Sequence, residues 1–146
     1  MNEKRELIFT RILVPTDLSE NSKKALDTVF KMGVTDEHRI FLLHVIETLQ
    51  SDEDNEFQFF YDKLRDRAAR KMGTMIKKYG NENFIIEKEI VYGNRSIEII
   101  RFAHEYDINL IVLTSHRIEN LEPSEGWATI SYKVGILSPC PVLLVK

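Results

Sequence analysis

The first residues that can carry chemistry are Pro15, Thr16 and Asp17, which come directly after an apolar run ending at Val14. A carboxylate at this position can accept hydrogen bonds from the hydroxyl groups of a ribose or the amino group of an adenine. Asp17 can instead hold the first turn of a following helix, because Asp17 and Glu20 have the spacing of a capping box in which Asp replaces the usual Ser or Thr. The residues alone leave both roles open.

A second candidate site is the long polar segment 115–129, which lies between the apolar runs Asn109–Thr114 and Pro141–Lys146. It leads into a short helical pattern that ends before Pro139. If the protein binds a small ligand, we expect this segment to close over it.

The histidines and the single cysteine do not have the spacing of a metal site. The four histidines show no paired or HxxxH spacing, and no cysteine stands near them. Ser115-His116 lacks the glycines of a nucleophile elbow, which argues against a hydrolase triad. His44 lies inside an apolar run, so we expect it to be a hydrogen-bonded core residue. No catalytic residue and no metal ligand is predicted.

The elements that must position these residues follow from the hydrophobic pattern. Apolar or alternating runs of strand length recur along the chain. The predicted strands are Leu7–Val14, Arg39–Ile46, Phe84–Tyr92, Asn109–Thr114 and Pro141–Lys146. The half-polar alternation of the third run indicates an edge strand.

Helical patterns separate these runs. The first predicted helix is capped by Asp17 or Ser19 and stops at Gly33. The second is the clearest, because its apolar residues recur in steps of three and four from Phe57 to Tyr79 and are expected to pack on a sheet. The third follows the Gly93-Asn94 turn and carries Ile97, Ile100, Ala103 and Tyr106 on one side.

Alternation of strands and helices predicts right-handed crossovers and a doubly wound α/β fold, with a parallel sheet covered by helices on both faces. In such sheets ligands bind beyond the carboxyl ends of the strands, where the strand order reverses. The positions to consider are therefore the tips after Val14, Val45 and Thr114.

Composition narrows the classes of function. The chain has 146 residues, which fits one domain covering 1–146. A net charge of -3 gives no reason to expect binding to nucleic acid or to a membrane. No apolar run approaches the ~20 residues needed to span a bilayer, and the first six residues lack the apolar core of a signal peptide. We expect a cytoplasmic protein.

Four stretches together resemble the universal stress protein family: Ile12–Glu20, Leu42–Val45, the Gly93 turn and Ser138–Val145. The resemblance implies an α/β fold of the adenine nucleotide alpha hydrolase-like type, with five parallel strands in the order 3-2-1-4-5. It also implies a role in regulating the stress response and, in many members, a homodimer through the last strand. An exposed apolar edge at Pro141–Lys146 gives such a dimer a physical motive.

Members that bind ATP carry a loop of Gly, two residues, Gly, nine residues, Gly, then Ser or Thr. In this chain the two leading glycine positions fall at Thr114 and Arg117, and the final pair falls at Ala128-Thr129 with one residue more between. Side chains there hinder the approach of backbone N–H groups to phosphates. The Arg117 guanidinium and the Thr129 hydroxyl can compensate, and Ser115-His116-Arg117 resembles the Ser-His-Arg of a subgroup whose first glycines are also altered.

Three acids in this segment, Glu119, Glu122 and Glu125, disfavour a triphosphate because each repels it. The resemblance therefore leaves two main functions open. The first is binding of ATP, with Mg, or AMP in the crevice at the carboxyl ends of strands 1 and 4. The nucleotide-binding residues it implies are Pro15, Thr16, Asp17, Val45, Thr114, Ser115, Arg117, Ala128 and Thr129.

The second function is that of a dimeric adaptor module of the same fold that binds no nucleotide. A third, a hydrolase or nucleotidyl transferase using His116 and Asp17, is the weakest. Because nothing in the sequence supplies an activated nucleophile or a well-placed base, we expect binding that biases a conformation and at most slow ATP hydrolysis.

Overall fold

Strands and helices alternate along the chain. The computed structural model describes residues 7–48, 57–80, 86–115 and 130–146. The strands are β1 (Arg11–Pro15), β2 (Arg39–Ile46), β3 (Ile86–Tyr92), β4 (Leu110–Thr114) and β5 (Val142–Val145). The helices are α1 (Lys23–Lys31), α2 (Gln58–Lys77), α3 (Arg95–Glu105) and α4 (Ile130–Leu137). The predicted strand at Leu7–Val14 began too early, because β1 pairs with its neighbours only from Arg11 onward.

The five strands form one parallel sheet in the order β3-β2-β1-β4-β5, which confirms the predicted fold. β1 is central, and its Ile12 pairs with Ile40 of β2 and Leu110 of β4. The chain builds outward from β1 to β3 on one side and from β4 to β5 on the other. The strand order therefore reverses between β1 and β4, where ligands bind in this class of sheet.

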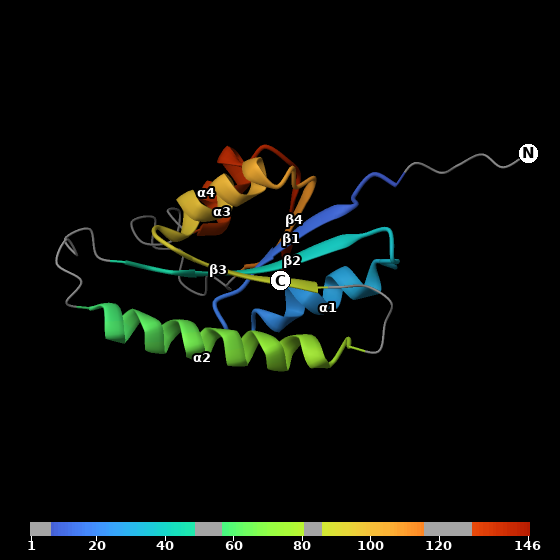
Figure 1. Cartoon of the computed structure of the whole chain (residues 1–146). Helices are drawn as coiled ribbons and strands as arrows, with labels where there is room; N and C mark the ends of the chain where they lie inside the picture. Colours follow the sequence, from blue (N-terminus) through green and yellow to red (C-terminus); the bar gives the residue numbers. More distant parts are fainter. Residues whose placement is uncertain (1–6, 49–56, 81–85, 116–129) are drawn as a thin grey trace, which may run out of the picture.

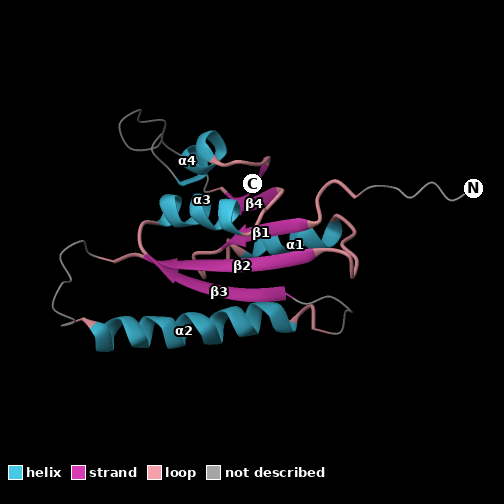
Figure 2. Ribbon diagram, turned by 45° about the horizontal axis from the view of Figure 1, so that its top comes forward, coloured by secondary structure: helices cyan, strands magenta, loops and turns pink. Residues whose placement is uncertain are grey.

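Helices cover both faces of the sheet (Figures 1 and 2). Residues of α1 and α2 share one buried cluster with Ile12 and Val14 of β1. Residues of α3 and α4 share the other cluster with Leu13. Because successive strand residues point to opposite faces, the run Ile12-Leu13-Val14 feeds both cores, which explains why it is apolar without interruption.

The long helix α2 packs on the sheet as predicted. Its buried residues are Tyr61, Ala68, Met72 and Met75. Phe57 and Phe60, expected in the same stripe, are 44% and 55% exposed. A helix of 20 residues is about 30 Å long, whereas the eight-residue β2 spans about 26 Å, so the first turn of α2 has less sheet to cover.

The apolar side predicted for α3 is only partly the side that the structure buries. The structure buries Ser96, Ile99, Phe102 and Ala103. Ile97 is 53% and Tyr106 37% exposed. Apolar residues occupy a wide arc of this helix, so spacing alone does not single out its buried side. Packing does, because the Phe102 ring meets Phe41 of β2 at 5.6 Å between centroids.

The Gly93-Asn94 turn starts α3 as predicted. Asn94 precedes the helix, and its side-chain oxygen accepts a hydrogen bond from Ile97 N at 3.1 Å. Gly93 has φ +143°, and a Cβ there would lie 2.9 Å from Glu98 Oε1. Only glycine fits this turn without strain.

The edge strands differ in composition. β3 is an edge strand, as its alternating sequence predicted, and it carries Glu87, Lys88 and Glu89. β5 forms the other edge and is entirely apolar.

Candidate functional site

The point of reversed strand order is built around Thr16, directly after β1. Thr16 is 7% exposed. Its N–H donates to Leu43 O at 2.8 Å, and its carbonyl oxygen lies 2.9 Å from His44 Nδ1. Its hydroxyl meets the Ser22 hydroxyl at 2.7 Å and accepts from Leu18 N at 3.0 Å. Hydrogen bonds therefore hold the loop after β1 at both its main chain and its side chain.

Asp17 is half-buried in this loop and makes a tight turn with Ser19. Its Oδ1 accepts hydrogen bonds from Ser19 N at 2.9 Å and from the Ser19 hydroxyl at 2.5 Å. The prediction that Asp17 or Ser19 caps the first helix was wrong, because α1 begins only at Lys23. Residues 17–22 form a turn between β1 and α1. The Asp17 carboxylate is therefore held on the loop at the carboxyl end of β1.

Thr114, at the end of β4, bonds to α1. Its hydroxyl accepts a hydrogen bond from Ala25 N at 3.1 Å and lies 3.4 Å from Ser22 O. Ser22 makes no side-chain cap bond, since its hydroxyl meets Ser19 O at 2.7 Å instead. A strand residue 89 positions away in sequence thus satisfies an amide in the first turn of α1.

Ser115 is buried beside Thr114. Its N–H donates to Val145 O of β5 at 2.8 Å. The main chain at Ser115, where the polar segment 115–129 begins, is therefore fixed to β5.

Pro15 and Val45 are buried. Val45 is 3% exposed and packs in the core cluster that contains Leu13 and Ile99. Its side chain belongs to the core under α3 and is not turned toward the loop after β1. The structure brings Thr16 and Thr114 together through Ser22, whereas Arg117, Ala128 and Thr129 lie outside the described residues.

His44 is hydrogen-bonded, as predicted, but it is half-buried and not a core residue. Burial lowers its pKa from 6.5, the Thr16 carbonyl offsets part of this, Arg95 lowers it further and Asp17 raises it. At neutral pH the ring is uncharged, and Nδ1 must carry the proton to donate to that carbonyl. Because Nδ1 donates to a backbone carbonyl, His44 helps to orient the loop. Its Nδ1 partner is therefore not a hydroxyl nucleophile.

Ser22 is the important residue that the sequence reasoning missed. It joins Thr16 on β1's side to Thr114 on β4's side. The only signal was a cluster of hydroxyl residues, Thr16, Ser19 and Ser22, with the three-residue spacing that closes a turn.

The described residues contain neither a metal-binding cluster nor a membrane-spanning helix. Within these residues, no group of three or more His, Cys, Asp or Glu side chains is placed to hold a metal ion. Over the same residues, no helix has the length and apolar character needed to cross a membrane.

Comparison with known proteins places this geometry in one family. Residues 9–146 match the model of the universal stress protein family. Universal stress protein YxiE of Bacillus subtilis is 30% identical over 150 residues, which cover 95% of this chain and 100% of YxiE.

Solved structures share the fold. The structure of protein MJ0577 of Methanocaldococcus jannaschii is 28% identical and superposes with a TM-score of 0.80, covering 96% of this chain and 97% of the other. A universal stress protein family protein from Arabidopsis thaliana with AMP bound is 18% identical, with a TM-score of 0.67 and coverage of 94% and 91%.

Proposed function

Because this chain belongs to the universal stress protein family, we propose that it binds an adenine nucleotide at the carboxyl ends of β1 and β4. Two observations support the proposal. The strand order reverses between these two strands, which is where such sheets bind ligands. The Arabidopsis relative with the same fold has AMP bound.

The observation that carries the proposal is the held position of Asp17. A carboxylate kept in a turn by Ser19, on a loop anchored by His44 and Ser22, is preorganised to accept hydrogen bonds from ribose hydroxyls. Preorganisation reduces the conformational entropy lost on binding. The neutral His44 beside it adds no positive charge that would draw Asp17 away.

The phosphate side of the proposed site follows from the sequence. Arg117 supplies a cation, and Thr129 supplies a hydroxyl near a helix start. Mg would accompany ATP and neutralise part of the phosphate charge. Binding then biases a conformation that partners in a stress response recognise, which is regulation rather than efficient turnover.

The test is titration calorimetry with AMP and ATP, on wild type and on Asp17→Asn. The amide keeps the oxygen that accepts from Ser19 but removes the charge, so affinity should fall roughly tenfold or more. The matched control is Asp36→Asn, an exposed acid in the connection between α1 and β2, at the opposite ends of the strands. Equal affinity of Asp17→Asn and wild type would remove Asp17 from the site.

A second function, an adaptor that binds no nucleotide, is favoured by one observation. The Thr114 hydroxyl is already engaged by α1, and its side chain stands where relatives that bind ATP have a glycine. Absence of heat at millimolar AMP and ATP, together with no nucleotide released from the purified protein, would rule out the first function and leave this one.

We further propose a homodimer through β5. Leu143 and Leu144 on this edge strand are 39% and 38% exposed, and its unpaired backbone groups can pair with a second copy. Leu144→Arg should convert the dimer to a monomer on gel filtration, whereas Lys88→Glu on the opposite edge should not. A dimer that survives Leu144→Arg places the interface elsewhere.

A further inference from the structure

The charged residues of this protein are unevenly distributed. The chain as a whole is acidic, whereas α2 is basic. The helix contains six Lys or Arg and two Asp, a net charge of +4. Since the whole chain carries -3, everything outside α2 carries -7. All eight charged residues of α2 are exposed.

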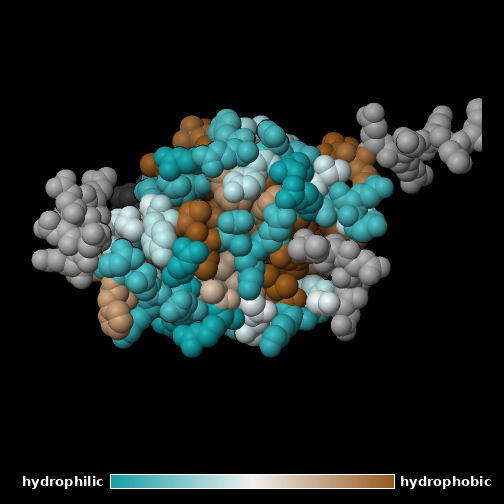
Figure 3. Space-filling view, in the orientation of Figure 1, coloured by the Kyte–Doolittle hydropathy of each residue, from teal (hydrophilic) through white to brown (hydrophobic). Residues whose placement is uncertain are grey.

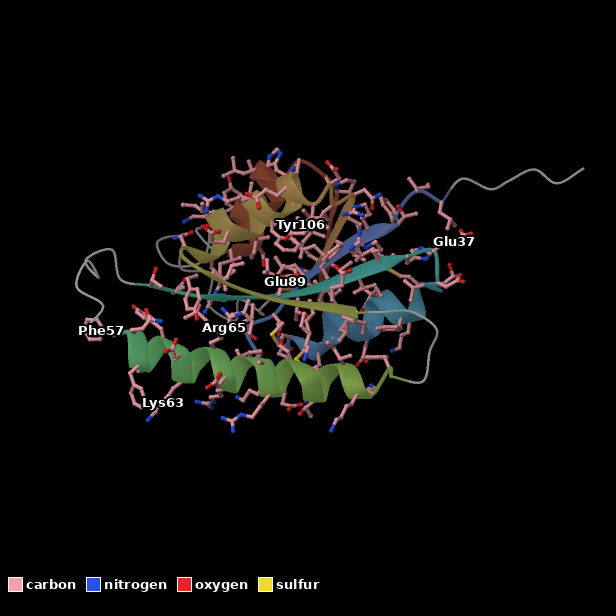
Figure 4. All side chains as sticks on the ribbon, in the orientation of Figure 1. Glu37, Phe57, Lys63, Arg65, Glu89 and Tyr106 are labelled. Carbon is pink, nitrogen blue, oxygen red and sulfur yellow. The ribbon has the colours of Figure 1, made fainter. Side chains whose placement is uncertain are left out.

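Four of the six cations lie in a row on the side of α2 that faces away from the sheet. We call this surface the α2 ridge; it consists of Phe59, Phe60, Lys63, Arg67, Arg70 and Lys77. From Lys63 the cations follow in steps of four, three and seven residues, which keeps them on one side of a helix and spreads them over about 21 Å. Figure 4 shows Lys63 on this outward side and Arg65 on the side toward β3.

Within the described part of the chain, no cation of α2 forms an ion pair. The neighbouring Lys78, just past the helix, does pair with Asp27 at 2.9 Å. Lys63 Nζ instead lies 4.6 Å from the centre of the Phe59 ring. The α2 ridge therefore presents positive charge to the surroundings that the described residues do not neutralise.

Exposed aromatic rings stand at the N-terminal end of the same surface. Phe59 is 72% and Phe60 55% exposed, and Phe57 just before the helix is 44% exposed. Figure 3 shows hydrophilic side chains along the rim where α2 lies, with an apolar group at the end where Figure 4 labels Phe57. Three exposed Phe within four residues are costly in water and gain from contact with an apolar medium.

We propose that the α2 ridge docks the protein onto an anionic lipid bilayer. Cations near an anionic surface and a few apolar rings that enter the interface are the two signals that together give stable peripheral binding. This inference is independent of nucleotide binding.

Shape and charge favour a bilayer over other anionic partners. α2 forms the outermost layer of the described residues on its side of the molecule (Figures 1 and 2), so its outer side can lie against a plane. Asp66 stands among the cations of the ridge. Mobile headgroups rearrange around one acid, whereas the fixed phosphates of a duplex do not, and a duplex backbone offers nothing to Phe59 and Phe60.

The experiment is cosedimentation of the full chain with vesicles of phosphatidylcholine containing about 30% phosphatidylglycerol, at about 50 mM salt. Vesicles of phosphatidylcholine alone should not bind, and raising salt to about 500 mM should release the protein. Arg67→Gln/Arg70→Gln should lower the partition coefficient roughly thirtyfold, since each cation near the surface contributes about one factor of five. Phe59→Ala should also lower the partition coefficient at about 50 mM salt, because one apolar ring fewer enters the interface.

The matched control is Lys133→Gln/Lys146→Gln, which removes the same charge from α4 and the C-terminal end, where both residues are exposed. It should bind like wild type, and circular dichroism should show both double variants folded. Equal loss in the two double variants, or no binding of wild type to the anionic vesicles, overturns the proposal. So does binding to duplex DNA or to polyglutamate without binding to vesicles.

Discussion

The two strand ends that meet at the reversal of strand order use the same kind of side chain over different sequence distances. After β1, the Thr16 hydroxyl bonds to Leu18 and Ser22, within six residues. After β4, the Thr114 hydroxyl bonds to Ala25 and Ser22, about 90 residues away. The first end is held mainly by its own loop and the neighbouring strand, whereas the second holds together parts of the fold that are distant in sequence.

This difference shows that Thr114 has a structural role that the ATP-binding loop pattern does not describe. In the ATP-binding pattern its position is glycine, and a glycine has no side-chain oxygen to accept from the amide of Ala25. In this chain the hydroxyl serves α1, so the departure from the pattern has a physical reason besides nucleotide binding. The β4 end is thus a structural joint as well as the start of the altered loop.

The largest effect is expected for Thr114→Gly, which removes this joint. The variant loses the acceptor for Ala25 N and adds the backbone entropy of a glycine at the end of a strand, which together cost about 2 kcal/mol of the free energy of unfolding. Urea unfolding monitored by circular dichroism measures it. Thr114→Ser keeps the hydroxyl and should remain within about 0.5 kcal/mol of wild type; equal stability of the two variants would mean that the hydroxyl does not hold α1.

The same comparison shows what was predictable from the sequence. The strands were predictable because buried parallel strands are continuous apolar runs, as in Ile12–Val14. The edge position of β3 was predictable from its polar alternation. The start of α1 was not, because it depends on Ser22 turning its hydroxyl back to Ser19 while Thr114 arrives from another strand. Local capping rules consider only residues that are close together in the sequence.

Two further features could not be predicted from the sequence, namely the charged surface of α2 and the buried side of α3. The net charge of -3 conceals a helix of +4, so the composition of the whole chain does not describe the charge of this one surface. In α3, residues Ile97, Ile99, Ile100 and Phe102 are all apolar, and only the contact with Phe41 selects the buried side. Both features depend on which side of a helix faces solvent, and packing against the sheet determines that side.

A smaller effect tests the β1 end, through the pH dependence of stability. Burial holds the pKa of His44 below the 6.5 of an exposed histidine. As pH falls below about 6.5, the unfolded chain takes up this proton before the folded chain does. Stability that is fully present above that pH is therefore lost as the pH falls through the lower, folded pKa.

His44→Asn separates this titration from the hydrogen bond, because the amide nitrogen of Asn can still donate to the Thr16 carbonyl but does not ionise. Between pH 7 and pH 5, urea unfolding of wild type should lose more stability than that of the variant. The difference should be a few tenths of a kcal/mol, since the ring is only half-buried and solvent screens part of the cost. Parallel curves for the two proteins would show that His44 protonates as easily in the folded chain as in the unfolded one, and the β1 loop would then not depend on a neutral ring.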